Sequence, residues 1–155
     1  MKTFLIALLL FCVVPFLFGG NNPRSIKIIR TNVAPIIDGY GDDKVWKQAN
    51  SADDFIQRDP YEGQPATEKT KVKILYDENN IYFFAMMYDS SPDSIVARLA
   101  RRDSEIESDY FSIRIDSYHD KQTAFEFTIN ASGSKVDILQ YDDGNKEDLS
   151  WDPVW

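Results

Sequence analysis

The residues best suited to bind a ligand are aromatic and charged side chains between positions 101 and 155. Aromatic rings stack on the C–H faces of sugars, and charged side chains can bind pairs of hydroxyl groups. Both kinds are present: Arg101, Arg102, Asp109, Tyr110, Tyr141, Trp151 and Trp155. We therefore predict a carbohydrate-binding site built from Tyr110, Trp151, Trp155, Arg102 and Asp109. The same aromatic rings would equally well close the end of a packed sheet.

An acidic stretch near the end of the sequence carries the oxygen ligands that calcium prefers. The candidate ligands surround Gly144, and they are Asp142, Asp143, Asn145 and Asp148. Their spacing does not match the twelve-residue helix-loop-helix pattern. A calcium site and a solvated acidic turn account for these residues equally well, and no organic cofactor is expected.

Groups that could catalyse a reaction are scarce. His119 is the single histidine, and no glycine-flanked serine is present to act with it as a nucleophile. Carboxylates are abundant in a chain with 25 acidic residues, but abundance does not define the paired geometry that glycoside hydrolysis requires. We expect a protein that binds without breaking bonds.

The stretch from Ser108 to Gly133 is the element that would position these side chains. Residues 111–116 alternate between apolar and polar types, and residues 124–130 repeat the alternation after a polar tip at 118–122. This pattern predicts a β-hairpin with one buried apolar face and one solvated polar face. Asp109 and Tyr110 begin it and residues 130–133 end it, so we expect any ligand at that open end.

The rest of the chain also favours short strands. We expect strands at 25–30, 54–58, 71–76, 81–88 and 136–141, short helices beginning near Asp42 and Ser91, and loops at 59–65 and 142–148. Trp46 would anchor the first helix on a sheet, with a sugar-stacking role as the less favoured alternative. The run 81–88 is apolar on both faces, which predicts a central strand covered by a second layer. The predicted fold is therefore an all-β, antiparallel, jelly-roll-like β-sandwich.

The first 20 residues predict export from the cytoplasm. Lys2 precedes an apolar run over residues 4–18, which has the length of a secretory signal peptide. Removing residues 1–20 also removes Cys12, the single cysteine, and leaves residues 21–155 as one domain. The net charge of −8 argues against a nucleic-acid partner. We expect the protein in the periplasm, at the outer membrane or secreted.

Several segments together carry a resemblance to a known family. Residues 37–39 with 42–46, the paired strands over 72–88, and the segments 108–116 and 125–133 resemble family 9 carbohydrate-binding modules. The segments 53–58, 116–120, 141–145 and 151–155 resemble the version found at the N-terminus of large bacterial outer-membrane proteins. The resemblance implies a β-sandwich that binds sugars in an aromatic-walled cleft, often with structural calcium. Such modules commonly accompany glycoside hydrolases such as xylanases, so xylan or cellulose is the expected type of ligand.

The resemblance also suggests alternatives. Family members continue past the residues matching Trp155 with strands that complete the sandwich, and longer relatives add a membrane β-barrel, so this chain resembles a truncated fragment. One alternative function is a front domain that packs on such a barrel and binds no sugar. Another is the accessory part of a glycoside hydrolase. A remote one is haem binding through His119 with Met86 or Met87.

Overall fold

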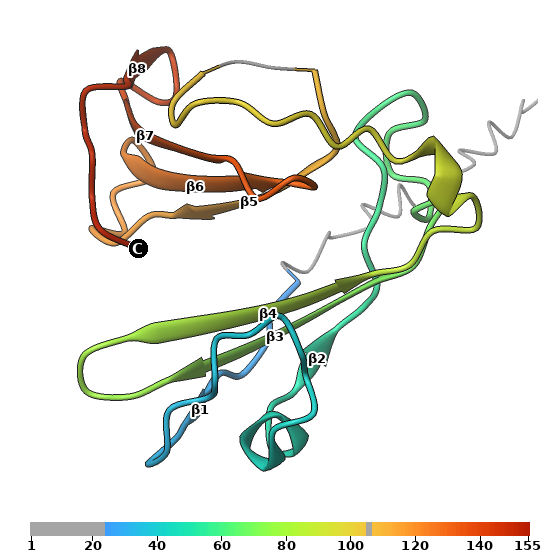
Figure 1. Ribbon diagram of the computed structural model, residues 1–155. Coiled ribbons are helices and arrows are strands. Elements are labelled where there is room, and N and C mark those ends of the chain that lie inside the picture. Colours follow the sequence, from blue (N-terminus) through green and yellow to red (C-terminus); the bar gives the residue numbers. More distant parts are fainter. Residues whose placement is uncertain (1–23, 105–106) are drawn as a thin grey trace, which may run out of the picture. The chain divides into compact units, whose positions relative to one another are not determined.

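The computed structural model describes residues 24–104 and 107–155, and Figure 1 shows the arrangement of strands in each of its parts. The predicted signal peptide lies outside the described residues. The chain divides into two compact units, residues up to 66 with 70–86, and residues 67–69 with 87–155. Each unit is built on one four-stranded sheet. Two such sheets with very little helix confirm the predicted all-β class and are consistent with a β-sandwich.

The first sheet is centred on β3. Its elements are β1 (Ile29–Arg30), the 3-10 helix η1 (Lys44–Lys47), β2 (Ser51–Ala52), β3 (Thr70–Tyr76) and β4 (Ile81–Met87). β2 pairs with β3 in antiparallel fashion, whereas β1 pairs with it in parallel, so the sheet is not fully antiparallel as predicted. β4 also pairs with β3.

The core of the first unit forms around Trp46 and Leu75. Trp46 is 3% exposed and Leu75 is fully buried, and together with Ala49 they form a cluster against which Phe84 packs. The Nζ atom of Lys73 donates to the carbonyl oxygen of Trp46 at 2.8 Å, which ties η1 to β3. The predicted anchoring role of Trp46 is therefore confirmed, and its burial leaves no ring face free for a sugar.

Gly41 allows the chain to approach this core closely. A Cβ atom at position 41 would lie 2.3 Å from the Cζ atom of Phe84, well inside van der Waals contact. Only a residue without a side chain fits against the ring of Phe84 here. Gly41 thus fixes how the segment that leads into η1 passes over β4.

The second sheet is an antiparallel meander. Its unit contains the 3-10 helix η2 (Pro92–Ser94), β5 (Tyr110–Ile115), β6 (Ala124–Asn130), β7 (Lys135–Tyr141) and β8 (Lys146–Asp148), with the strands in the order β5-β6-β7-β8. Ile113 pairs with Phe127, and Tyr110 pairs with Asn130. The predicted hairpin, its alternation and its open end are confirmed.

Several predicted elements are shorter than expected or lie elsewhere. The strand predicted at 25–30 is only β1, and the strand predicted at 54–58 is reduced to a single bridge between Ile56 and Pro65. Both predicted helices are single 3-10 turns. The second ends at Ser94 because Ile95 is extended, and the next residue, Val96, exchanges hydrogen bonds with Asp109.

Two further predictions were wrong. β4 pairs only with β3 among the described strands, so it is an edge strand of its sheet and not the predicted central strand. The acidic segment 142–148 is a turn followed by β8, because Lys146 pairs with Tyr141 and forms an ion pair with Asp142 at 3.2 Å. The apolar run 81–88 therefore did not indicate a central strand, and the acidic run 142–148 did not indicate a loop over its whole length.

Replacing Leu75 by alanine should destabilise the first unit strongly. The side chain is fully buried, and Leu→Ala substitutions at such sites cost about 2–5 kcal/mol because they leave a cavity. Urea denaturation followed by circular dichroism measures the loss. Ile37→Ala is the control, since Ile37 is 81% exposed and its truncation should change stability by less than about 0.5 kcal/mol. Equal losses for the two variants would contradict the proposed core.

The turn between β3 and β4 should make stability depend on pH in acid. The hydrogen bond from the hydroxyl of Tyr82, at 2.6 Å, and those from the backbone of Asn79 and Asn80 lower the pKa of Asp77 to about 2. An unfolded aspartate has a pKa of about 3.9, so the stabilisation is complete above that pH and is lost as the pH falls towards 2. Thermal melts from pH 6 to pH 2 should show a difference in melting temperature between the natural protein and Asp77→Asn that disappears in this window. A difference in melting temperature that stays constant across this pH range would contradict the prediction.

Candidate functional site

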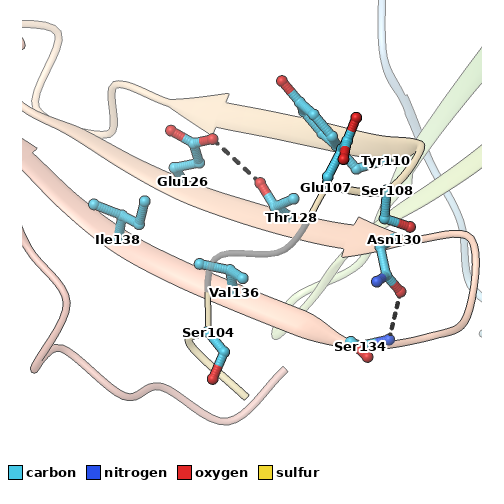
Figure 2. Close-up of a pocket in the computed structure, with 10 residues that line it drawn as sticks. All are labelled: Ser104, Glu107, Ser108, Tyr110, Glu126, Thr128, Asn130, Ser134, Val136 and Ile138. Carbon is cyan, nitrogen blue, oxygen red and sulfur yellow. Dashed lines mark hydrogen bonds between the residues drawn. The ribbon is translucent and has the colours of Figure 1, made fainter. Parts of the chain in front are cut away.

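An open groove of about 610 Å³ lies on the polar face of the second sheet. Figure 2 shows Glu126 and Thr128 of β6 rising from the same side of the sheet as Val136 and Ile138 of β7. Side chains alternate along a strand, so residues 126, 128 and 130 share one face with 136 and 138. The remaining lining residues lie towards the open end of the hairpin: Ser104, Glu107, Ser108, Tyr110, Asn130 and Ser134. The groove is therefore at the end of the hairpin where the sequence predicted a ligand.

Glu126 is the centre of a hydrogen-bond network in the floor of the groove. Its carboxylate accepts bonds from Arg114 Nε at 2.8 Å, Ser112 Oγ at 2.7 Å and Gln140 Nε2 at 2.9 Å. Thr128 Oγ1 adds a fourth at 3.2 Å. These bonds hold the carboxylate in one orientation before any ligand arrives.

This network corrects one expectation about the polar face. The sequence predicted a fully solvated face, yet Glu126 and Gln140 are buried. They are covered because Arg114 reaches over Glu126, and Gln140 also donates to Glu147 of β8 at 3.2 Å. The polar face is a connected layer of charged and amide groups.

The charge on Glu126 is stabilised despite its burial. Burial alone would raise the pKa of this carboxyl, but the hydrogen bonds from Arg114 and Ser112 and the positive charge of Arg114 outweigh it and lower the pKa below its usual value. Glu126 is therefore ionised at neutral pH and acts as a fixed acceptor. Arg114 next to it is a fixed donor with a side chain that is more than half exposed.

The open end of the groove combines a free aromatic ring with ordered polar groups. The side chain of Tyr110 is 67% exposed at the start of β5. The Oδ1 atom of Asn130 accepts a bond from the backbone nitrogen of Ser134 at 2.8 Å, shown in Figure 2, and its Nδ2 donates to the carbonyl of Arg98 at 2.8 Å. Stacking at one end and donors and acceptors along the floor are the groups that a polyhydroxylated ligand needs.

The predicted tryptophans lie on the opposite face of the same sheet. Trp151 packs on Phe125 with ring centroids 4.8 Å apart and on Phe127 at 5.6 Å, and Trp155 packs edge-on against Phe127 at 5.4 Å. The structure thus separates Tyr110 from Trp151 and Trp155, which do not form one cluster. Their contacts are those of the alternative interpretation, in which the aromatic rings cover the sheet.

Arg102 also lies on that opposite face. Its Nη2 donates to the buried carboxylate of Asp137 and, at 2.8 Å, to the carbonyl of Pro153. Its Nε forms an ion pair with Asp152 at 3.0 Å. Arg102 therefore holds the C-terminal stretch, which runs back along the sheet after β8 (Figure 1).

Asp109 supports the groove without lining it. Its Oδ2 accepts a bond from the backbone nitrogen of Val96 at 2.8 Å, and its backbone pairs with Val96 and Ala131. Of the five predicted sugar-binding residues, Tyr110 alone lines the groove.

The predicted calcium ligands lie in and after the turn between β7 and β8. Asp142 is paired with Lys146, Asn145 Nδ2 donates to the carbonyl of Asp142, and Asp148 accepts from Ser150. The hydroxyl and backbone nitrogen of Ser150 lower the pKa of Asp148. Calcium binding in this turn stays a prediction.

Comparison with protein families bears on the function of this groove. The model of the carbohydrate family 9 binding domain-like family matches residues 37–148, which is most of the chain. The chain belongs to this family. Carbohydrate is therefore the kind of partner that the match supports, as the sequence resemblance implied. The comparisons with curated proteins and with solved structures found no match.

Family membership agrees with the character of the groove. The match begins at Ile37 and ends at Asp148, so it includes β5 to β8 and every residue that lines the groove. Binding without catalysis is typical of such domains. Among the described residues, no helix is long and apolar enough to cross a bilayer.

Glu126, Arg114 and Gln140 are not among the site residues predicted from the sequence. The signal was available for the first two, because they occupy alternate positions that face each other across the predicted hairpin. Gln140 could be placed only through the register of β6 with β7, where Ala124 pairs with Gln140.

Removing the arginine should raise the pKa of Glu126. In Arg114→Gln the effect of burial on the carboxyl is no longer opposed by a positive charge and a charged hydrogen bond. An NMR titration of the glutamate side-chain carbons measures the shift. Arg98→Gln is the control, because Arg98 pairs with exposed Glu107 and not with Glu126. An unchanged titration in Arg114→Gln would contradict the network.

Proposed function

We propose that the groove on the polar face of β5, β6 and β7 binds a segment of a neutral polysaccharide of the xylan or cellulose type. The observation that carries the proposal is the preorganised Glu126 carboxylate, with four donors bound to it, in the floor of a groove in a family 9 domain. A sugar hydroxyl both donates and accepts, so it can bind between a fixed carboxylate and a fixed guanidinium.

Tyr110 supports the same proposal from the end of the groove. Its exposed ring offers a flat face for a pyranose, and it is positioned by the pairing with Asn130. The charged residues that line the groove are Glu107 and Glu126, both acidic. An uncharged sugar suits this lining better than a uronic acid, whose carboxylate would be repelled.

The sequence supports a role outside the cytoplasm. The apolar run over residues 4–18 favours export, and a family 9 domain there would hold a polysaccharide during its breakdown by glycoside hydrolases. In this proposal the protein supplies affinity for the substrate, and other proteins supply the bond-breaking step.

Isothermal titration with xylohexaose and cellohexaose tests the proposal. Tyr110→Ala should weaken binding about fivefold, because a stacking interaction is worth about 1 kcal/mol. Tyr118→Ala is the matched control, since Tyr118 is 70% exposed at the far end of the hairpin. Glu126→Gln should weaken binding more than tenfold, because it replaces the charged acceptor by a neutral amide of nearly the same shape.

The outcome separates the proposal from its main alternative. Saturable binding that depends on Tyr110 and Glu126, but not on Tyr118, supports the groove as the sugar site. A folded protein that binds neither oligosaccharide would contradict it and favour a front domain that packs on a membrane β-barrel. Equal losses for Tyr110→Ala and Tyr118→Ala would place the site elsewhere.

A further inference from the structure

Thr128 presents its hydroxyl oxygen to the groove as a hydrogen-bond acceptor. The residue lines the groove, and its Oγ1 donates to the carboxylate of Glu126 at 3.2 Å (Figure 2). An ionised carboxylate can only accept, so the direction of this bond is fixed. A hydroxyl group has a single hydrogen, and here it is used. Any further hydrogen bond between Thr128 Oγ1 and a ligand is therefore one that Thr128 accepts.

Two serines at the open end of the groove are bound in the same way. Ser108 Oγ donates to the carbonyl of Val96 at 2.6 Å, and Ser134 Oγ donates to the carbonyl of Ala100 at 3.1 Å. Carbonyl oxygens cannot donate, so both hydroxyl hydrogens are directed to the protein. Both serines can offer lone pairs to a ligand but no hydrogen.

The other polar groups of the lining add further acceptors. Both of its carboxylates accept when they are ionised. The amide nitrogen of Asn130 gives one hydrogen to the carbonyl of Arg98 at 2.8 Å. Ser104 and Tyr110 carry the two remaining hydroxyls of the lining, and Arg114 adds donor groups at one end. Most hydrogen bonds between the lining and a ligand are therefore accepted by the protein.

Thr128 is the best placed of these acceptors. It lies within β6 and pairs with Val136 of β7, so its oxygen stands between the charged network and the apolar part of the floor. Its hydrogen is donated to a charged group, and a hydroxyl polarised in this way is a stronger acceptor.

We propose that the groove selects sugar segments whose hydroxyl groups are unsubstituted, and that Thr128 is the residue that determines this specificity. The inference rests on the proposed binding of a xylan- or cellulose-type chain. An O-acetyl or O-methyl group replaces the hydroxyl hydrogen and leaves only acceptor oxygens on the sugar. Two acceptors that face each other form no hydrogen bond, although both lose their water. Substituted segments of a chain are therefore rejected.

Isothermal titration of the full chain with two ligands tests the proposal. One ligand is xylohexaose, and the other is xylohexaose with every hydroxyl O-methylated, which lacks the donors but keeps the oxygens. The natural protein should bind the methylated ligand about tenfold more weakly or worse. Thr128→Val keeps the shape of the side chain and removes its acceptor. It should weaken xylohexaose binding about fivefold and reduce the ratio of the two Kd values by the same factor.

Two further variants separate this specificity from a structural effect. Thr128→Ser restores the hydroxyl and should recover most of the affinity that Thr128→Val loses. Thr123→Val is the matched control, because Thr123 Oγ1 also donates to a carboxylate, that of Asp120 at 2.7 Å, but does not line the groove. It should change neither Kd. A purely structural role for Thr128 predicts equal losses for both ligands, with circular dichroism showing whether each variant is folded.

The possible outcomes distinguish this inference from the function on which it rests. Equal binding of the two ligands by the natural protein would overturn the inference and leave sugar binding intact. A preference for xylohexaose that persists unchanged in Thr128→Val would also overturn it, since the bulk of the methyl groups would then be the cause. If the methylated ligand gives no measurable heat, the recovery in Thr128→Ser decides. A folded protein that binds neither ligand contradicts the proposed function, and the inference with it.

Discussion

The second unit depends on neutralising one buried negative charge. Asp137 lies on the apolar face of β7, directly opposite Phe127, and no part of it is exposed. A lone carboxylate in that position would oppose folding, because desolvating an ion costs several kcal/mol. Arg102 and Trp155 supply the compensating contacts, and both belong to segments outside the sheet. Satisfying this charge therefore also determines where the segment before β5 and the segment after β8 must lie.

The groove depends on the same sheet in a different way. Glu126 is buried among polar groups on the other face, where Arg114, Ser112 and Gln140 share its charge. These partners come from β5 and β7, the two strands on either side of β6, so the register of β5 with β6 and of β6 with β7 has to be correct before the network forms. A shift by one residue would place Phe125 or Phe127 in the groove and Glu126 in the packed face. The hydrogen-bond network thus reinforces the register that creates it.

The sequence predicted the features that depend on local alternation and failed on those that depend on distant pairing. The hairpin, its open end and the anchoring role of Trp46 follow from periodicity and from a tryptophan flanked by small and apolar residues. The run 81–88 misled because hydrophobicity alone does not reveal how many strands lie beside it, and β4 proved to be an edge strand. Residue type suggests a sugar site for the tryptophans, but it does not specify the face of the sheet on which they lie. Asp103, Asp137 and Asp152, which all contact Arg102, meet only through tertiary structure, and their separations of 34 and 15 positions form no recognisable motif.

Strict alternation along β6 and β7 assigns the groove and the packed face of this sheet to separate sets of residues. Residues 126, 128, 136 and 138 line the groove, while the intervening residues 125, 127, 137 and 139 face the packed side. A change in groove chemistry at position 128 or 138 alters no side chain that Trp151, Trp155 or Arg102 touches. The lining of the groove can therefore be altered by single substitutions that leave the aromatic packing on the other face untouched.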